Sequence, residues 1–229
     1  MTRRPFCTKP SRQALSNRAA RGVGLAVAAL LAVAGCARAP EILPSPPTAS
    51  WYRAPDFALN EVRRVVVLPM EHPPQDLVAA ERVRQAMAAE LQKTGRFEVL
   101  CPPGDYFTCW RDDSLLRGIP TAELLADLAR HFAVDGVVFS SLRDYNVYGL
   151  PRISVVVHLV CTYNGMTLAS VDGQWDAQDA AVASRAIAYA QHNQASHRLG
   201  DAQMILKTPS WYERFVATEL AGLLFIPPS

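Results

Sequence analysis

Hydrophobic positions follow two different periods in the first half of the chain. An unbroken apolar run over residues 63–69 predicts a central strand that is covered on both faces of a sheet. Residues 76–93 then show the spacing of an amphipathic helix, which Gly95 can terminate. The predicted buried side of that helix consists of Leu77, Ala80, Val83, Met87 and Leu91. A short strand over 96–100 completes a β-α-β unit, which is typical of parallel strands joined by a right-handed crossover.

The second half of the chain predicts a helix, three successive strands and two further helices. The first helix begins at Pro120-Thr121, and its predicted buried side consists of Leu124, Leu125, Leu128 and Phe132. The three strands are expected over 137–148, 152–163 and 166–175. Asn164-Gly165 joins the last two strands and is a strong hairpin signal, with positive φ expected at both turn positions. Helices near 177–193 and 210–224 end the pattern.

These elements predict a single α/β (α+β) domain over residues 51–229. Their order is β-α-β-α-β-β-β-α, and the expected architecture is a mixed sheet with helices packed on it. The middle strand of the meander has a continuous apolar face, which consists of Val155, Val157, Leu159, Cys161 and Tyr163. We therefore expect this face to lie in the core, with Cys161 as a buried free thiol.

The first 35 residues predict a lipoprotein signal peptide. Residues 1–22 are basic, and the apolar run over 23–35 is too short for a bilayer, which needs about 20 residues. The run ends at Cys36, and residues 31–36 (LAVAGC) resemble a bacterial lipobox. That resemblance implies acylation of Cys36, which would tie the mature chain to a membrane. An ordinary signal peptide with an incidental cysteine is the alternative, and Arg3-Arg4 leaves both general and twin-arginine export open.

Residues 36–50 predict a lipidated, Pro-rich tether. Four of the 14 residues after Cys36 are proline, a composition that favours extended segments with a reach of about 40 Å. Ala37 follows the cysteine where an aspartate would resemble an inner-membrane retention signal. We therefore expect a lipid-anchored domain at the outer membrane, facing the periplasm.

Charge along the chain excludes a nucleic-acid partner. Six of the 23 basic residues lie in residues 1–35, which contain no acid, so the remaining 17 are outnumbered by 21 acidic residues. A nucleic-acid-binding protein needs a basic face, and the mature chain would be mildly acidic. Half of the residues are hydrophobic, which is enough to form a packed core.

Signals for catalysis are weak. The chain contains no G-x-S-x-G, H-E-x-x-H, P-loop or G-x-G-x-x-G motif. His72 is the strongest single candidate because it follows the first predicted strand, where parallel sheets place their ligands, but a structural turn is the preferred interpretation. His192 and His197 have no acidic or cysteine companion at ligand spacing. We predict no catalytic residue, no cofactor and no metal site.

The loop over 101–120 carries the remaining candidate sites. Cys101 and Cys109 bracket a turn-rich segment, and export to an oxidising compartment permits a disulfide, so we predict a bridge between them. Trp110 and Arg111 follow directly and are predicted partner contacts, because aromatic and arginine side chains dominate interface energetics. A solvated loop is the alternative for these two residues.

The order of elements resembles a group of bacterial envelope proteins. The matching pieces are residues 65–69, 94–100 and 134–141 together with the Asn164-Gly165 hairpin. The group comprises the curli-secretion channel lipoproteins, the lipoprotein activators of penicillin-binding proteins and the amino-terminal domain of the translocation protein TolB. The resemblance implies a sheet with packed helices and a function that depends on binding proteins.

Three functions follow from these observations. The preferred one is a membrane-anchored, non-catalytic adaptor or activator that binds an envelope protein or the cell wall. A subunit of an oligomeric secretion pore is the second, although a pore requires long amphipathic hairpins of about 9–11 alternating residues per strand, and the connections here are short. An envelope hydrolase is the third and has no motif to support it.

Overall fold

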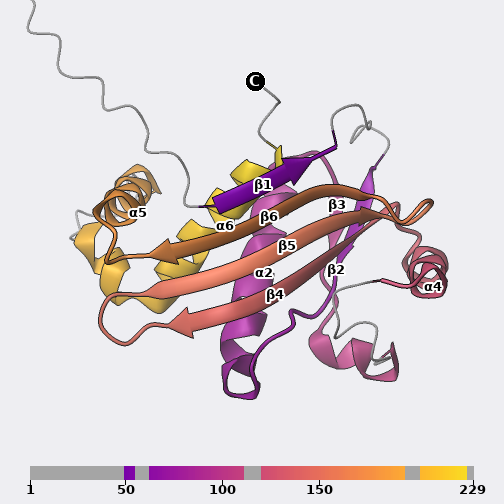
Figure 1. The fold of residues 1–229 in the computed structure, drawn as a ribbon, viewed down its shortest axis with the longest axis horizontal. Helices are drawn as coiled ribbons and strands as arrows, with labels where there is room; N and C mark the ends of the chain where they lie inside the picture. The colour runs from indigo at the N-terminus through magenta and orange to yellow at the C-terminus, as the bar shows by residue number, and fades with distance from the viewer. Residues whose placement is uncertain (1–48, 55–61, 111–119, 194–201, 226–229) are drawn as a thin grey trace, which may run out of the picture. The chain divides into compact units, whose positions relative to one another are not determined.

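The computed structural model describes residues 49–54, 62–110, 120–193 and 202–225, which belong to one compact unit (Figure 1). Six strands in this part of the chain form one mixed sheet in the order β1-β6-β5-β4-β2-β3. The strands are β1 (Ala49–Arg53), β2 (Arg64–Val67), β3 (Glu98–Leu100), β4 (Gly136–Asn146), β5 (Arg152–Cys161) and β6 (Thr167–Asp176). The helices are α2 (Leu77–Lys93), α4 (Ala122–Phe132), α5 (Ala180–Asn193) and α6 (Pro209–Phe225), with short 3-10 helices η1 (Pro74–Asp76), η2 (Gly104–Trp110) and η3 (Ala202–Lys207). The predicted α/β fold is confirmed.

The central strand β2 is buried from both sides, as its unbroken apolar run predicts. Val65, Val66 and Val67 are each fully buried. Val65 and Val67 belong to the larger core cluster, whereas Val66 belongs to a second cluster, because successive side chains of a strand point to opposite faces. Strand β2 pairs in parallel with both β3 and β4, so the predicted parallel β-α-β unit is also confirmed.

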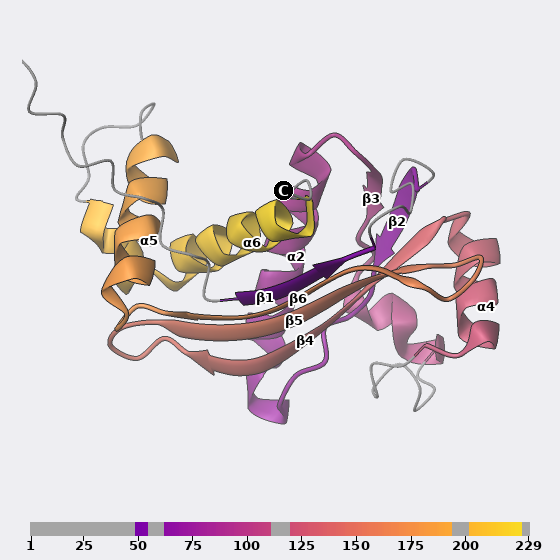
Figure 2. The same ribbon diagram turned by 45° about the horizontal axis from the view of Figure 1, so that its top comes forward.

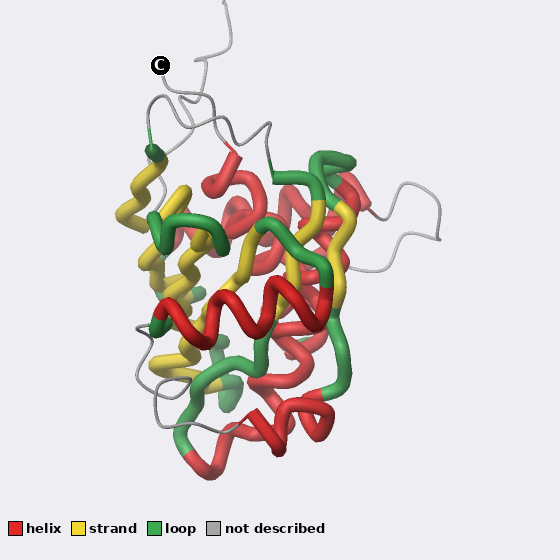
Figure 3. The backbone as a smooth tube through the Cα atoms, turned by 90° about the vertical axis from the view of Figure 1, so that its right-hand side faces the viewer, coloured by secondary structure: helices red, strands yellow, loops and turns green. Residues whose placement is uncertain are grey.

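Helices cover the two faces of the sheet unequally (Figures 2 and 3). Helices α2, α5 and α6 contribute to the larger cluster, whereas α4 and η2 contribute to the smaller one. Helix α4 begins as predicted, because the side chain of Thr121 accepts a hydrogen bond from the backbone N–H of Leu124 at 3.2 Å. The smaller cluster lies over β2 and its neighbours, so the C-terminal end of β2 has helical elements on both sides.

Strand β1 is the main element that the hydrophobic pattern missed. It pairs antiparallel with β6 from Ala49 opposite Gly173 to Arg53 opposite Ala169, so the last two residues of the predicted tether belong to the sheet. Trp51 and Tyr52 are 42% and 51% exposed. An edge strand with exposed side chains on both faces does not produce the alternating pattern that identifies half-buried strands.

The β5–β6 hairpin differs from its prediction in two details. Strand β5 ends at Cys161, which is buried as a free thiol as expected, but Tyr163 lies in the turn and is 86% exposed rather than in the core. In the turn, Gly165 has a φ of +69°, whereas Asn164 has negative φ and its Oδ1 accepts a hydrogen bond from the backbone N–H of Met166. The connection is therefore a longer turn than the two-residue type that Asn-Gly favours.

Candidate functional site

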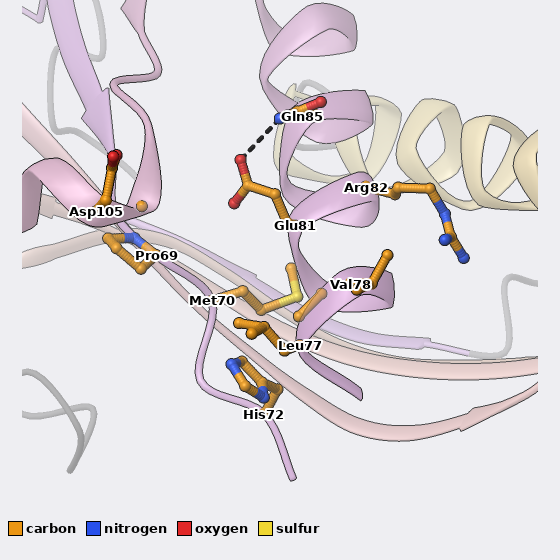
Figure 4. A pocket seen from close by; sticks show the side chains of 11 residues that line it. Pro69, Met70, His72, Leu77, Val78, Glu81, Arg82, Gln85 and Asp105 are labelled. Carbon is orange, nitrogen blue, oxygen red and sulfur yellow. Dashed lines mark hydrogen bonds between the residues drawn. The ribbon is translucent and has the colours of Figure 1, made fainter. Parts of the chain in front are cut away.

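A cleft with a volume of about 610 Å³ lies at the C-terminal end of β2 (Figure 4). Its walls come from the segment after β2, the first turns of α2 and the start of η2. The lining residues are Pro69, Met70, His72, Leu77, Val78, Ala80, Glu81, Arg82, Gln85, Gly104 and Asp105. Ligands of parallel sheets commonly bind at this end of the strands, so the cleft is the candidate functional site.

The segment after β2 is held against the neighbouring strand before it turns into α2. The backbone N–H of Glu71 donates to the carbonyl of Ser140 at 2.9 Å, and the carbonyl of Glu71 accepts from the N–H of Leu142 at 2.7 Å. Two prolines follow, and η1 begins at Pro74, where a fixed φ suits the start of a helix. This wall of the cleft is therefore fixed by backbone pairing and by proline.

The apolar part of the cleft is exposed at its rim. Met70 is 4% exposed, but Leu77 and Val78 in the first turn of α2 are 59% and 67% exposed. The helical spacing correctly placed Ala80, Val83, Met87 and Leu91 on the buried side of α2 and wrongly placed Leu77 there. The first turn of α2 extends past the sheet core, so two adjacent aliphatic side chains remain open to solvent.

Buried Arg84 joins two walls of the cleft. It is 1% exposed and donates to both carboxylate oxygens of Glu81, at 2.7 and 2.8 Å. It also donates to the carbonyl of Val67 at 3.1 Å and to the carbonyl of Pro102 at 2.9 Å. These contacts connect α2 to the end of β2 and to the loop that leads into η2.

Glu81 is held as a carboxylate by this arrangement. Burial on its own would raise the pKa of Glu81, but hydrogen bonds from Arg84 and from the amide of Gln85 outweigh it, and the pKa is lowered. The bond from Gln85 is visible in Figure 4. A carboxylate with these partners orders the cleft and is poorly suited to act as a general acid.

The buried carboxylate of Glu213 fixes the position of Arg82. Nε and Nη2 of Arg82 donate to Glu213 of α6 at 3.1 and 2.8 Å, and the Tyr145 hydroxyl donates to the same carboxylate at 2.6 Å. The side chain of Glu213 is 3% exposed and that of Arg82 is 44% exposed. Burial and the neighbouring Glu213 carboxylate raise the pKa of Tyr145, so its hydroxyl remains a donor. The guanidinium is therefore anchored on Glu213 and Tyr145, and Figure 4 shows the Arg82 side chain on the side of α2 opposite Glu81.

His72 lines the cleft and is half-buried. It is the histidine that follows the first predicted strand, where parallel sheets place their ligands. Its Nδ1 lies 2.7 Å from the carbonyl oxygen of Pro73, which fixes the ring against its own turn. Among the described lining residues there is no serine, threonine, cysteine or lysine that could act as a nucleophile with it. Within the described residues, no group of three or more His, Cys, Asp or Glu side chains is arranged to hold a metal ion.

The other predicted site residues lie partly or wholly outside the described residues. Cys36 and Arg111 are outside them, and nothing is described of the side chains of Cys109 and Trp110. The backbone of Trp110 ends η2, the 3-10 helix whose first residues, Gly104 and Asp105, line the cleft. The two predicted partner contacts, Trp110 and Arg111, therefore come within seven residues of Gly104 and Asp105 along the chain.

The predicted disulfide stays a prediction. Cys101 has a free, half-buried thiol in the structure, and the position of the Cys109 sulfur is not described. Burial raises the pKa of Cys101, although the nearby Arg84 guanidinium acts in the opposite direction. We expect mass spectrometry of the exported, non-reduced protein to find the two peptides joined. Two free thiols, or a bridge from either one to Cys161, would contradict the prediction.

In the described ranges, no helix combines the length and the apolar character that crossing a bilayer requires.

Comparisons with known proteins find similarity only among solved structures. No family model and no curated protein sequence matches the chain. A single-substitution variant of the PelC dodecamer from Paraburkholderia phytofirmans is similar with a TM-score of 0.48 and 15% identity, over 78% of this chain and 99% of that chain. Lipoprotein GNA1162 from Neisseria meningitidis is similar with a TM-score of 0.38 and 18% identity, over 60% and 99% of the two chains. Protein XCC0632 from Xanthomonas campestris has a TM-score of 0.35 and 12% identity, over 79% and 87%. At these scores and identities the likenesses identify neither a family nor a function.

Proposed function

We propose that this chain is a bacterial envelope lipoprotein that is anchored through Cys36 and binds another envelope protein with the cleft at the start of α2. It acts as a non-catalytic adaptor or activator. The observation that carries the proposal is the exposure of Leu77 and Val78, at 59% and 67%, beside a cavity of about 610 Å³. The lipobox resemblance that ends at Cys36 supports the anchor.

The composition of the cleft favours a protein partner. Leu77 and Val78 lie side by side on a helix, and covering one such side chain fully contributes about 1.5–3 kcal/mol. Arg82, Glu81 and Gln85 follow on the same helix and form a polar border next to this apolar centre. An apolar centre with a polar border is the usual anatomy of a protein interface.

Fixed side chains at the border add specificity to this site. Arg82 is held on Glu213 and Tyr145, and Glu81 is held on Arg84 and Gln85, so neither border charge has to be ordered when a partner binds. Ordering a long side chain at an interface costs about 0.5–1.5 kcal/mol, which this arrangement avoids. The cleft is therefore prepared for binding in the unbound chain.

The anchor is tested by replacing Cys36 with serine. A serine cannot form the thioether to diacylglycerol, so we expect the variant to be unlipidated and to leave the detergent phase in Triton X-114 partitioning. The wild-type chain, with several acyl chains on one residue, should remain in that phase. A variant that still fractionates with membranes like wild type would show that the lipobox interpretation is wrong.

The cleft is tested by placing one carboxylate at two positions of α2. Val78→Glu puts a charge in the apolar centre, whereas Ala89→Glu puts it at an exposed position of the same helix outside the cleft. Both chains should fold, because both positions are solvent-exposed and glutamate is a good helix former. After cross-linking in intact envelopes and affinity capture, we expect Val78→Glu to recover at least tenfold less of one specific protein than Ala89→Glu.

Equal recovery of the same proteins by the two glutamate variants would contradict the proposed cleft. Recovery of the chain itself as the main cross-linked product would favour the alternative, a subunit of an oligomeric secretion complex. The abundance of each variant is measured in the same samples, so that loss of the protein is not mistaken for loss of binding.

A further inference from the structure

The two turns of the β4-β5-β6 meander present aromatic side chains at opposite ends of the sheet. Tyr148 and Leu150, in the turn between β4 and β5, are 92% and 46% exposed. Tyr163 and Met166, in the turn between β5 and β6, are 86% and 48% exposed. Figure 1 shows the two turns at opposite ends of the long strands. Each turn therefore presents one exposed tyrosine and one exposed aliphatic side chain, and the two turns differ mainly in their position on the sheet.

Strand register places the beginning of β1 near the β4–β5 turn, which carries Tyr148. Ala49 pairs with Gly173, and Asp176, three residues further along β6, is opposite Arg152 at the start of β5. Three residues of strand span about 10 Å, so the chain enters the sheet close to the β4–β5 turn. The other end of β6, at Thr167, is six residues from Gly173 in the opposite direction, or about 20 Å.

Other exposed apolar side chains belong to elements at the same end of the sheet as the β4–β5 turn. Helix α5 follows directly from the end of β6, and η3 and the start of α6 lie beside it (Figures 1 and 2). Met204 in η3 and Trp211 in the first turns of α6 are 46% and 37% exposed. This end of the sheet therefore combines the entry of the chain with several exposed aromatic and aliphatic groups.

The length of chain before β1 limits how far this end can lie from a membrane. Twelve residues lie between Cys36 and Ala49, and fully extended they reach about 40 Å. A second contact made by a molecule that is already tethered is intramolecular, so even a small contact surface becomes effective. Measured along the chain, the end of the sheet where β1 begins is the end nearest to Cys36.

We propose that the β4–β5 turn rests on the surface of the bilayer that holds Cys36, with Tyr148 and Leu150 at the level of the lipid headgroups. The inference rests on the proposed lipid anchor. Tyrosine is enriched at membrane interfaces because its ring is apolar and its hydroxyl is polar, and leucine favours the adjoining acyl region. Contact at this turn fixes the orientation of the sheet relative to the membrane, in addition to its distance.

The two tyrosines provide a matched test. The photo-reactive residue p-benzoylphenylalanine replaces Tyr148 in one full-length, lipidated chain and Tyr163 in another. Each chain is reconstituted in vesicles of phosphatidylethanolamine and phosphatidylglycerol and irradiated, and covalent phospholipid adducts are measured by mass spectrometry. We expect at least fivefold more lipid adduct at position 148 than at position 163.

Equal or smaller lipid labelling at position 148, or labelling there only by a second protein chain, would overturn the proposal. Detergent partitioning of the same samples separates this result from failure of the anchor. If the chains remain in the detergent phase without preferential labelling, the anchor stands and the docking proposal fails. If the chains leave the detergent phase, both fail, because docking depends on the tether.

Discussion

Replacing Arg84 with methionine is expected to lower the free energy of unfolding by about 3 kcal/mol. Methionine fills much of the volume, but the carbonyls of Val67 and Pro102 lose their donor, and Glu81 loses its charged partner. Removing one member of a buried ion pair costs about 3–5 kcal/mol, and we expect the lower end because the Glu81 side chain is 35% exposed and can hydrate. Urea unfolding followed by circular dichroism measures the change.

Arg130→Met is the matched control for this prediction. Arg130 on α4 forms an ion pair with Asp127 at the same three-residue spacing as the Arg84–Glu81 pair. The side chain of Arg130 is 78% exposed, so its loss should cost at most about 0.5 kcal/mol. A change at Arg84 as small as the change at Arg130 would show that the buried guanidinium does not hold the cleft together.

Trp175→Ala is expected to lower the free energy of unfolding further still, by about 4 kcal/mol. Trp175 is 1% exposed in the larger core cluster, and truncating a buried tryptophan costs about 3–5 kcal/mol through lost burial and the cavity that remains. Its indole Nε1 also donates to Glu219 of α6 at 3.4 Å. Thermal and urea unfolding should both show the loss.

Gly173 explains how this tryptophan fits beneath the edge strand. A Cβ at position 173 would lie 2.5 and 2.7 Å from two ring carbons of Trp175 and 2.9 Å from the Cβ of Ala49 in β1. We therefore expect Gly173→Ala to cost about 1–3 kcal/mol in the native background, as overpacking does. In the Trp175→Ala background most of that cost should disappear. Additive effects in this double-mutant cycle would contradict the proposed contact.

The parts of the fold with strong local periodicity were predictable from the sequence. The unbroken valine run identified β2, and the helical spacing identified α2 and α4 nearly to the residue. Strand β1 was not predictable in this way, because its pairing with β6 joins residues about 120 apart and leaves its aromatic side chains exposed. Pairing between distant segments decides whether such a short edge strand exists.

The candidate site was less predictable than the fold. Its position after β2 followed from strand order, but Leu77 was assigned to the core because periodicity cannot show where a helix extends past its sheet. Arg84 does have a sequence signal, since it occupies an apolar position of the α2 repeat between Ala80 and Met87. The contact of Arg82 with Glu213 joins residues 131 apart, and no local pattern indicates it.

Site-specific cross-linking from α2 tests the central claim most directly. The photo-reactive residue p-benzoylphenylalanine is placed at position 78, in the cleft, or at position 89, on the same helix outside it, and intact envelopes are irradiated. We predict one discrete protein adduct of defined mass from position 78 and none from position 89. The same adducts from both positions, or no protein adduct from position 78 at normal abundance of the anchored chain, would contradict the claim that this cleft binds an envelope protein.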